Sequence, residues 1–156
     1  MSHEKLNDKH VPFYTILETA SKSENPSESI KEAMKNDSRV LTVLGYALNP
    51  SFKFKLPEGI PPYIPSQHVL SVEPLEILKS ASRLYIMCST ESKQFKREEM
   101  FIQWLEDMSP EEAELMIHIK DQTLPDAFEN KITLDMYLNA LGWDKEVYLR
   151  LKNPKI

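Results

Sequence analysis

The chain has 156 residues, of which 41% are hydrophobic and 28% are charged. These fractions are close to those of ordinary globular domains, and they exclude a wholly disordered, collagen-like or membrane-embedded chain. Only 3 residues are glycine, and no glycine-rich phosphate-binding motif occurs in the chain. The net charge of −5 argues against nucleic acid as the default partner, although it leaves a local basic patch open.

The cysteine content and the N-terminal residues bear on the cellular compartment. Cys88 is the only cysteine, so it has no partner for an internal disulfide, which fits a reducing environment. Residues 1–10 are polar and charged, and they predict a flexible tail rather than a signal peptide. The longest apolar-rich stretch, 40–48, is about half of what a bilayer requires. We therefore expect a cytoplasmic protein that does not associate with membranes.

Helical periodicity begins directly after the tail. Apolar residues at helical spacing after Pro12 predict a short first helix. The sequence from Asn25 to Glu28 is typical of a helix start, because an asparagine cap, a first-turn proline and an acidic third residue follow one another. The wide apolar stripe over residues 38–48 predicts a largely buried helix, which Pro50 ends.

Residues 50–74 have a different character. Six of them are proline, which excludes a helix and favours an extended strap packed across the helices. The segment also carries apolar side chains that are too many to leave in water: Phe52, Phe54, Leu56, Tyr63 and Ile64. We expect Gly59 to lie in a turn and Lys53 and Lys55 to face solvent.

The second half of the chain is again helical in its periodicity. Helices are predicted over 75–90, around 100–108, from Ser109 to about residue 121, from Thr133 to Gly142, and from Asp144 to about residue 151. The predicted core residues of this half are Met100, Phe101, Trp104, Leu105, Leu115 and Ile119. The sequence therefore predicts an all-α fold: an irregular single-domain bundle of seven or eight short helices over residues 11–156, with the proline-rich strap in its middle.

No pattern in the chain predicts a catalytic, cofactor or metal site. The four histidines are not at metal-ligand spacing, and Glu114 and His118 form a single helical pair four residues apart. We therefore expect no cofactor, no metal and no enzymatic activity. A noncanonical carboxylate and histidine site is the remaining enzymatic alternative.

Charged residues gather in one part of the chain. Between Glu98 and Ile119 there are seven carboxylates and no lysine or arginine. This acidic run is a solvated face with favourable charge at a helix N-terminus, a docking face for a basic partner, a nucleic-acid mimic, or the source of a carboxylate pair for acid–base work. The cluster of Lys93, Lys96 and Arg97 just before it is too small to predict nucleic-acid binding. The candidate partner-binding residues are Lys53, Lys55, Tyr63, Glu106, Asp107, Glu111 and Glu112.

Two stretches of the chain resemble a known family. The first, from Tyr46 to Ser66, contains LPEGIPPYIPS, and the second, from Lys96 to Pro125, contains KREEMFIQWLEDMSPEEAELMIHIKD. Together they resemble a family of small proteins of unknown function encoded by large tailed bacteriophages of the myovirus type. The resemblance covers roughly residues 11–125 and not residues 133–156. It implies no activity and no site residues, but it does imply a viral protein that works in the bacterial cytoplasm or in a virion.

Three hypotheses for the function follow. The one we favour is a non-enzymatic phage accessory protein that binds a host or phage protein in transcription, replication or counter-defence, in the host cytoplasm. The second is a structural component of the virion, in the neck, tail or head. The third is the noncanonical enzyme. Neither nucleic acid nor a membrane is expected as a partner, and the sequence leaves the partner's identity and the oligomeric state open.

Overall fold

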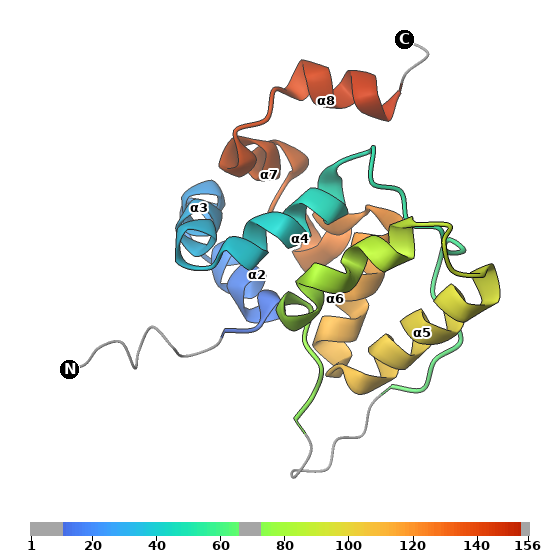
Figure 1. The fold of residues 1–156 in the computed structure, drawn as a ribbon. Coiled ribbons are helices and arrows are strands. Elements are labelled where there is room, and N and C mark those ends of the chain that lie inside the picture. Colours follow the sequence, from blue (N-terminus) through green and yellow to red (C-terminus); the bar gives the residue numbers. More distant parts are fainter. Residues whose placement is uncertain (1–10, 66–72, 154–156) are drawn as a thin grey trace.

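The computed structural model describes residues 11–65 and 73–153. The predicted tail, 1–10, lies outside these residues, as does the part of the predicted strap from 66 to 72. The described part of the chain forms seven α-helices and two 3₁₀ helices, with no strand, so the predicted all-α fold is confirmed (Figure 1). The helices are α2 (Phe13–Ser21), α3 (Pro26–Asn36), α4 (Ser38–Leu48), η1 (Leu78–Cys88), α5 (Gln94–Asp107), α6 (Pro110–Asp121), η2 (Leu124–Asn130), α7 (Leu134–Leu141) and α8 (Lys145–Lys152).

Side-chain caps set several of these boundaries where the sequence predicts them. The Asn25 side chain accepts the backbone N–H of Glu28 at the start of α3. The Ser109 and Asp144 side chains accept backbone N–H groups in the same way at the starts of α6 and α8. Gly142 adopts a left-handed conformation with φ of 74° directly after α7, where a side chain is disfavoured.

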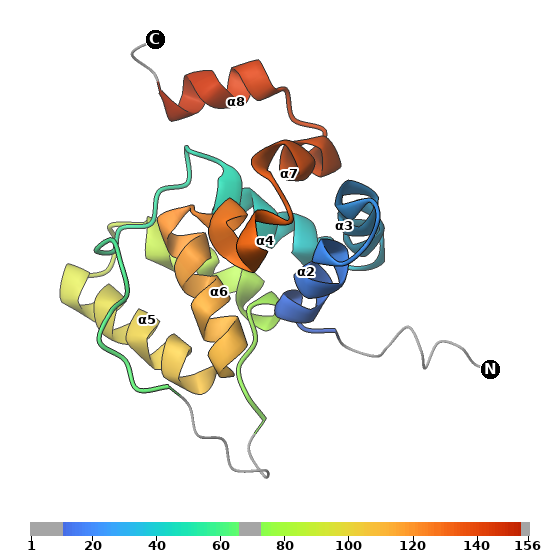
Figure 2. The same cartoon turned by 180° about the vertical axis from the view of Figure 1, so that it is seen from behind.

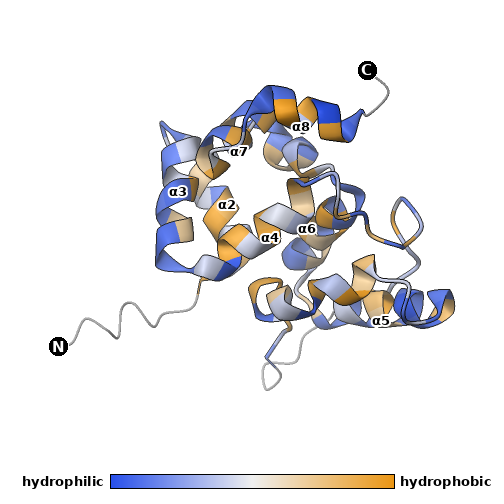
Figure 3. Ribbon diagram, turned by 45° about the horizontal axis from the view of Figure 1, so that its top comes forward, coloured by the Kyte–Doolittle hydropathy of each residue, from blue (hydrophilic) through white to orange (hydrophobic). Residues whose placement is uncertain are grey.

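Helix α4 lies at the centre of the molecule and packs against α3, α6 and η1 (Figure 1). Its apolar stripe is buried, as the sequence predicts: Val40, Val43, Leu44, Ala47 and Leu48. Figure 3 shows apolar residues on α2 and α4 and mainly polar ones on α3. Among the described residues, no helix has both the length and the apolar character needed to cross a bilayer.

Most of the predicted core residues of α5 and α6 are buried: Phe101, Trp104, Leu105, Leu115 and Ile119. Met100 is an exception, and its prediction was wrong, because 37% of its surface is exposed. The buried positions of α5 are 97, 101, 104 and 105, which share one stripe of the helix. At about 100° per residue, Met100 falls at the edge of that stripe rather than on it.

The helix predicted over 75–90 is a 3₁₀ helix, η1, and it is shorter than predicted. A 3₁₀ helix has three residues per turn, so every third residue shares a face. The buried apolar residues of η1 follow this spacing: Leu78, Ala81, Leu84 and Met87. In an α-helix Ser82 and Tyr85 would share a face with Leu78, whereas in η1 both are exposed and Leu78 is buried.

Residues 50–65 form no helix and lie along α5 (Figures 1 and 2). Side chains from α5, α6 and the turn after α6 bond to the backbone of this segment. Lys120 donates to the carbonyl oxygens of Pro57 at 2.8 Å and Gly59 at 2.9 Å. Glu106 accepts the N–H of Ile64 at 2.9 Å. These bonds hold the segment although it has almost no regular hydrogen bonding of its own.

The exposure of residues 50–65 agrees in part with prediction. Lys53 and Lys55 face solvent, and Gly59 turns the chain with φ of 95°. Phe54, Leu56 and Tyr63 are partly buried against the core, whereas Phe52 and Ile64 are exposed, contrary to expectation. A continuous strap over 50–74 stays a prediction, because residues 66–72 are not described.

Candidate functional site

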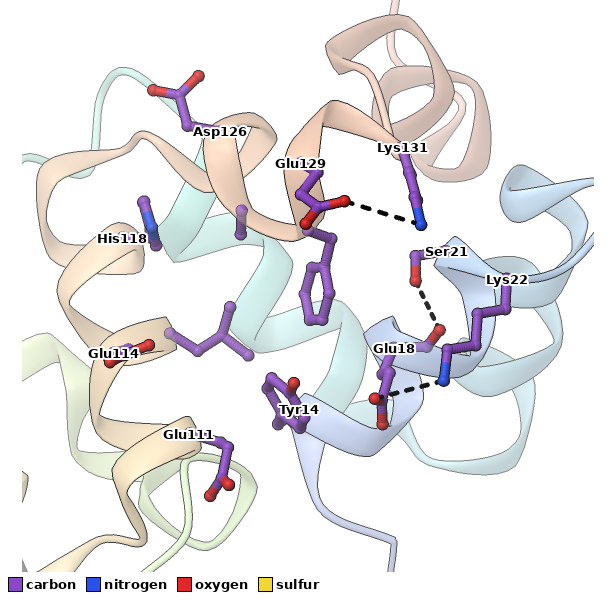
Figure 4. A pocket seen from close by; sticks show the side chains of 13 residues that line it. Tyr14, Glu18, Ser21, Lys22, Glu111, Glu114, His118, Asp126, Glu129 and Lys131 are labelled. Carbon is purple, nitrogen blue, oxygen red and sulfur yellow. Dashed lines mark hydrogen bonds and ion pairs between the residues drawn. The ribbon is translucent and has the colours of Figure 1, made fainter.

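A hollow of about 420 Å³ lies between α2, α6 and the segment that follows α6 (Figure 4). We call it the acidic hollow, because five carboxylates line it together with Tyr14, Phe128 and His118. The carboxylates are Glu18, Glu111, Glu114, Asp126 and Glu129. Lys22 and Lys131 are the lysines of its lining. Four of the carboxylates lie within residues 111–129, and folding brings Glu18 of α2 to them from about 90 residues away in the sequence.

Helical geometry places one wall of the acidic hollow. Glu111, Glu114 and His118 are separated by three and four residues, so they share one face of α6. The opposite wall begins at Tyr14, the second residue of α2. The backbone N–H of Tyr14 donates to the carboxylate of Glu112 at 2.7 Å, which fixes the start of α2 against the first turn of α6.

The charges of the acidic hollow are only partly balanced. Glu18 pairs with Lys22 at 3.5 Å, and Glu129 with Lys131 at 3.9 Å. Three further carboxylates have no hydrogen bond or ion pair from their side chains within the described residues: Glu111, Glu114 and Asp126. An excess of negative charge therefore faces solvent there, and it favours a cationic ligand.

The phenol of Tyr14 lies among these carboxylates. Burial raises the pKa of Tyr14, and the negative charges of Glu18, Glu111 and Glu114 raise it further. The ring of Tyr14 also contacts the ring of Phe128, with the ring centres 5.3 Å apart. The acidic hollow thus offers aromatic surface beside unpaired carboxylates, a combination that suits the flat cation of arginine or the ammonium of lysine.

The rim of the acidic hollow has an unusual backbone. Phe128, Glu129 and Asn130 have φ values of 56°, 56° and 62°, which are left-handed conformations in three consecutive non-glycine residues. This conformation costs roughly 1–2 kcal/mol each at Phe128 and Glu129, whereas asparagine tolerates it better. Surrounding contacts must maintain this strain, and strained segments are common where a protein holds a ligand.

His118 is not placed as a catalytic base would be. Its Nδ1 atom lies 2.8 Å from the hydroxyl of Thr123, so one ring nitrogen is occupied by a contact with the turn that follows α6. Among the described residues, no three histidine, cysteine, aspartate or glutamate side chains are placed so that together they could hold a metal ion. What the acidic hollow offers chemically is recognition of positive charge.

The seven candidate partner-binding residues predicted from the sequence do not form one site in the structure. Glu111 lies in the acidic hollow, whereas Tyr63 does not line it and is partly buried against the core. Burial, followed by the charge of Glu114, raises the pKa of Tyr63. Glu106 holds the backbone of Ile64, and Asp107 is exposed at the end of α5. Lys53 and Lys55 are exposed on a different part of the chain.

Glu112 does not lie on an exposed face, and in this respect the prediction of a docking role requires correction. Its side chain is buried, with 3% of the residue exposed. The carboxylate accepts the N–H of Ile77 at 2.8 Å as well as that of Tyr14. Glu112 therefore joins three segments of the core rather than presenting charge to a partner.

Sequence reasoning missed most of the acidic hollow. Tyr14, Glu18, Asp126 and Glu129 come from outside the acidic run, and no local pattern connects them to it. The spacing of Glu111, Glu114 and His118 was the available signal, because it places two carboxylates on one helix face.

Comparison with known proteins adds a family. Residues 16–126 match a family described as a family of unknown function (DUF6433). The match covers more than half of the chain, so the protein belongs to this family, and the expectation of an uncharacterised family is confirmed. No curated protein and no solved structure matches the chain. The matched residues include α3 to α6, whereas α7 and α8 lie beyond them.

Proposed function

We propose that this protein is a non-enzymatic accessory protein of a tailed bacteriophage that binds a host or phage protein in the bacterial cytoplasm. The acidic hollow is its docking surface. The observation that carries the proposal is the group of carboxylates beside the Tyr14 ring that have no ion-pair partner within residues 11–65 and 73–153, above all Glu111 and Glu114. The resemblance of the two sequence stretches to phage proteins supports the viral part of the proposal.

The chemistry of the acidic hollow favours a basic segment of a protein as its occupant. A lysine or arginine side chain supplies the positive charge that the carboxylates lack, and its stem packs on Tyr14 and Phe128. Complementary charge speeds encounter and disfavours wrong partners, which suits a small protein that must find one target among many.

The proposal is tested by affinity capture with a tagged copy from cells infected by the phage that encodes it. The wild-type protein is compared with a variant carrying Glu111→Gln and Glu114→Gln. A matched control carries Glu32→Gln and Glu99→Gln, which remove the same charge from exposed positions outside the acidic hollow. We expect one stoichiometric protein with wild type and control, and its loss with the first variant. Equal capture by all three proteins would contradict the docking role of the acidic hollow.

A virion component is the alternative to a cytoplasmic accessory protein. Mass spectrometry of purified phage particles distinguishes the two. The accessory role predicts that the protein is absent from the particles, and a constant number of copies per particle would overturn it.

A further inference from the structure

Three segments of the chain meet at Lys55, away from the residues of the acidic hollow. The N–H of Lys55 donates to the carbonyl of Met87 at 2.7 Å, near the end of η1. The carbonyl of Lys55 accepts Nε of Arg97 at 3.1 Å, from the second turn of α5. Folding thereby joins the lysines of residues 53–55 to the basic cluster at residues 93–97, two groups that are about 40 residues apart in the sequence.

Seven of the side chains exposed on the three segments that meet there are lysines or aromatic residues. Four are lysines: Lys53, Lys55, Lys93 and Lys96. Three are aromatic, with exposed fractions of 41% for Phe52, 57% for Tyr85 and 65% for Phe95. We call these seven residues the lysine–aromatic surface. Exposed apolar side chains that gather on one part of a surface often mark an interaction site.

The local charge is positive although the whole chain is negative. Residues 52–55 and 85–98 carry five cations and two carboxylates, Glu91 and Glu98. Arg97 is buried, and it donates only to uncharged acceptors: the carbonyls of Lys55 and Ser92 and the side-chain oxygen of Gln94. Within the described part of the chain, no carboxylate pairs with this guanidinium. Its full charge therefore adds to the potential of the surface.

The start of α5 adds to the same potential. Lys93 occupies the N-cap position and makes no side-chain cap, and the first turn of α5 contains no acidic residue. The partial positive charge of the helix N-terminus is thus left uncompensated. One ring of the surface, that of Phe52, is held in place by packing on the ring of Tyr46 at 5.0 Å between centres.

We propose that the lysine–aromatic surface binds single-stranded nucleic acid. Lysine ammonium groups contact phosphates, while Phe95, Tyr85 and Phe52 stack on bases, the combination used by proteins that bind single strands without sequence preference. A duplex hides its base faces and leaves the aromatic side chains without a role. From the sequence we expected no nucleic-acid partner, because the net charge of the chain is negative. The net charge does not describe a local basic surface that forms only when distant segments fold together.

The test is fluorescence anisotropy with a labelled deoxythymidine oligonucleotide of about 15 nucleotides, at several salt concentrations. Three variants are compared with wild type: Lys53→Gln with Lys55→Gln, Phe95→Ala, and Lys31→Gln with Lys35→Gln on α3 as the matched charge control. We expect the first variant to bind about 10-fold more weakly with a shallower salt dependence, since each lost phosphate contact lowers the slope by about 0.7. Phe95→Ala should weaken binding at least about 5-fold through lost stacking. The α3 control should bind as the wild type does.

Several outcomes would overturn this inference. One is no binding to the oligonucleotide at protein concentrations up to about 100 μM, the weak end of non-specific affinity. Three further results would each contradict a role in binding single strands. They are equally weakened binding by the α3 control, an unchanged affinity of Phe95→Ala for the oligonucleotide, and equal affinity of the wild type for a duplex. Tighter binding of poly-glutamate than of the oligonucleotide would identify an acidic protein as the occupant. The variant with Glu111→Gln and Glu114→Gln should keep its oligonucleotide binding, so this result is independent of the proposed function.

Discussion

The carboxylate of Glu112 reaches across 98 positions of the sequence to accept the backbone N–H of Tyr14. The same carboxylate accepts the N–H of Ile77, so one buried anion ties α2 and the residues before η1 to the start of α6. The wall of the acidic hollow on α2 therefore depends on a residue that is not itself in the hollow.

Replacing Glu112 with alanine should lower the free energy of unfolding by about 3–5 kcal/mol, because it leaves two buried N–H groups without an acceptor. Urea denaturation measures this loss. Glu111→Ala is the matched control, since its side chain is exposed on the adjacent position, and it should change the free energy by less than about 0.5 kcal/mol. Similar effects of the two variants would show that the bonds of Glu112 contribute little to stability.

Trp104→Ala should destabilise the protein by about 3–5 kcal/mol, because the indole is almost fully buried in the core. Met100→Ala, one turn earlier on α5, should lower stability by less than about 1 kcal/mol, since that side chain lies at the edge of the buried stripe. Thermal or urea unfolding followed by far-ultraviolet circular dichroism measures both values. A loss below about 1 kcal/mol for Trp104→Ala would place the indole outside the core.

Tyr137→Phe should leave stability unchanged or raise it by about 1 kcal/mol, because the buried hydroxyl has no hydrogen-bond partner within the described residues. The pH dependence gives a second readout. Burial raises the pKa of Tyr137 above its usual value of 10.0, so the unfolded chain releases this proton first as the pH rises. The contribution of the neutral Tyr137 side chain to the free energy of unfolding is therefore fully present below about pH 10 and is lost as the pH rises above that value.

In wild type, stability should therefore fall above about pH 10 more steeply than in Tyr137→Phe. Urea midpoints measured between neutral pH and about pH 11 test this difference in slope. Identical slopes for the two proteins would contradict the burial of the Tyr137 hydroxyl.

Lys120→Met should release the turn at residues 57–59, because the Nζ atom of Lys120 is bonded to the carbonyls of Pro57 and Gly59. Trypsin should then cut after Lys53 or Lys55 faster than it does in wild type. The control is Lys131→Met, which removes an exposed lysine of the acidic hollow and should leave these cleavage rates unchanged. Rapid cleavage of wild type at Lys53 or Lys55 would show that the segment is not held in the free protein.

Local sequence signals predicted most of the helices. Caps such as Asn25 and Ser109, and stripes such as that of α4, depend on neighbouring residues and on the α-helical period, so they are visible in a single sequence. The same reasoning failed for η1, whose buried residues recur every third position, and for Met100 at a stripe edge.

The surfaces could not be predicted in this way, because they depend on tertiary contacts. The acidic hollow needs Tyr14 and Glu18 beside α6, and the lysine–aromatic surface needs the backbone of Lys55 between η1 and α5. The charges themselves were visible in the sequence. Which of them become neighbours was decided by the packing of elements that are distant along the chain.

The three-residue period of η1 also limits how this part of the chain can change in length. Deleting or inserting one residue there turns every later side chain by about 120°, which would move Leu84 and Met87 out of the core and bring polar neighbours in. Inserting or deleting three residues leaves every later side chain on its original face of the helix. Length variation within η1 is therefore expected in multiples of three, whereas an α-helix such as α5 accommodates steps of three or four.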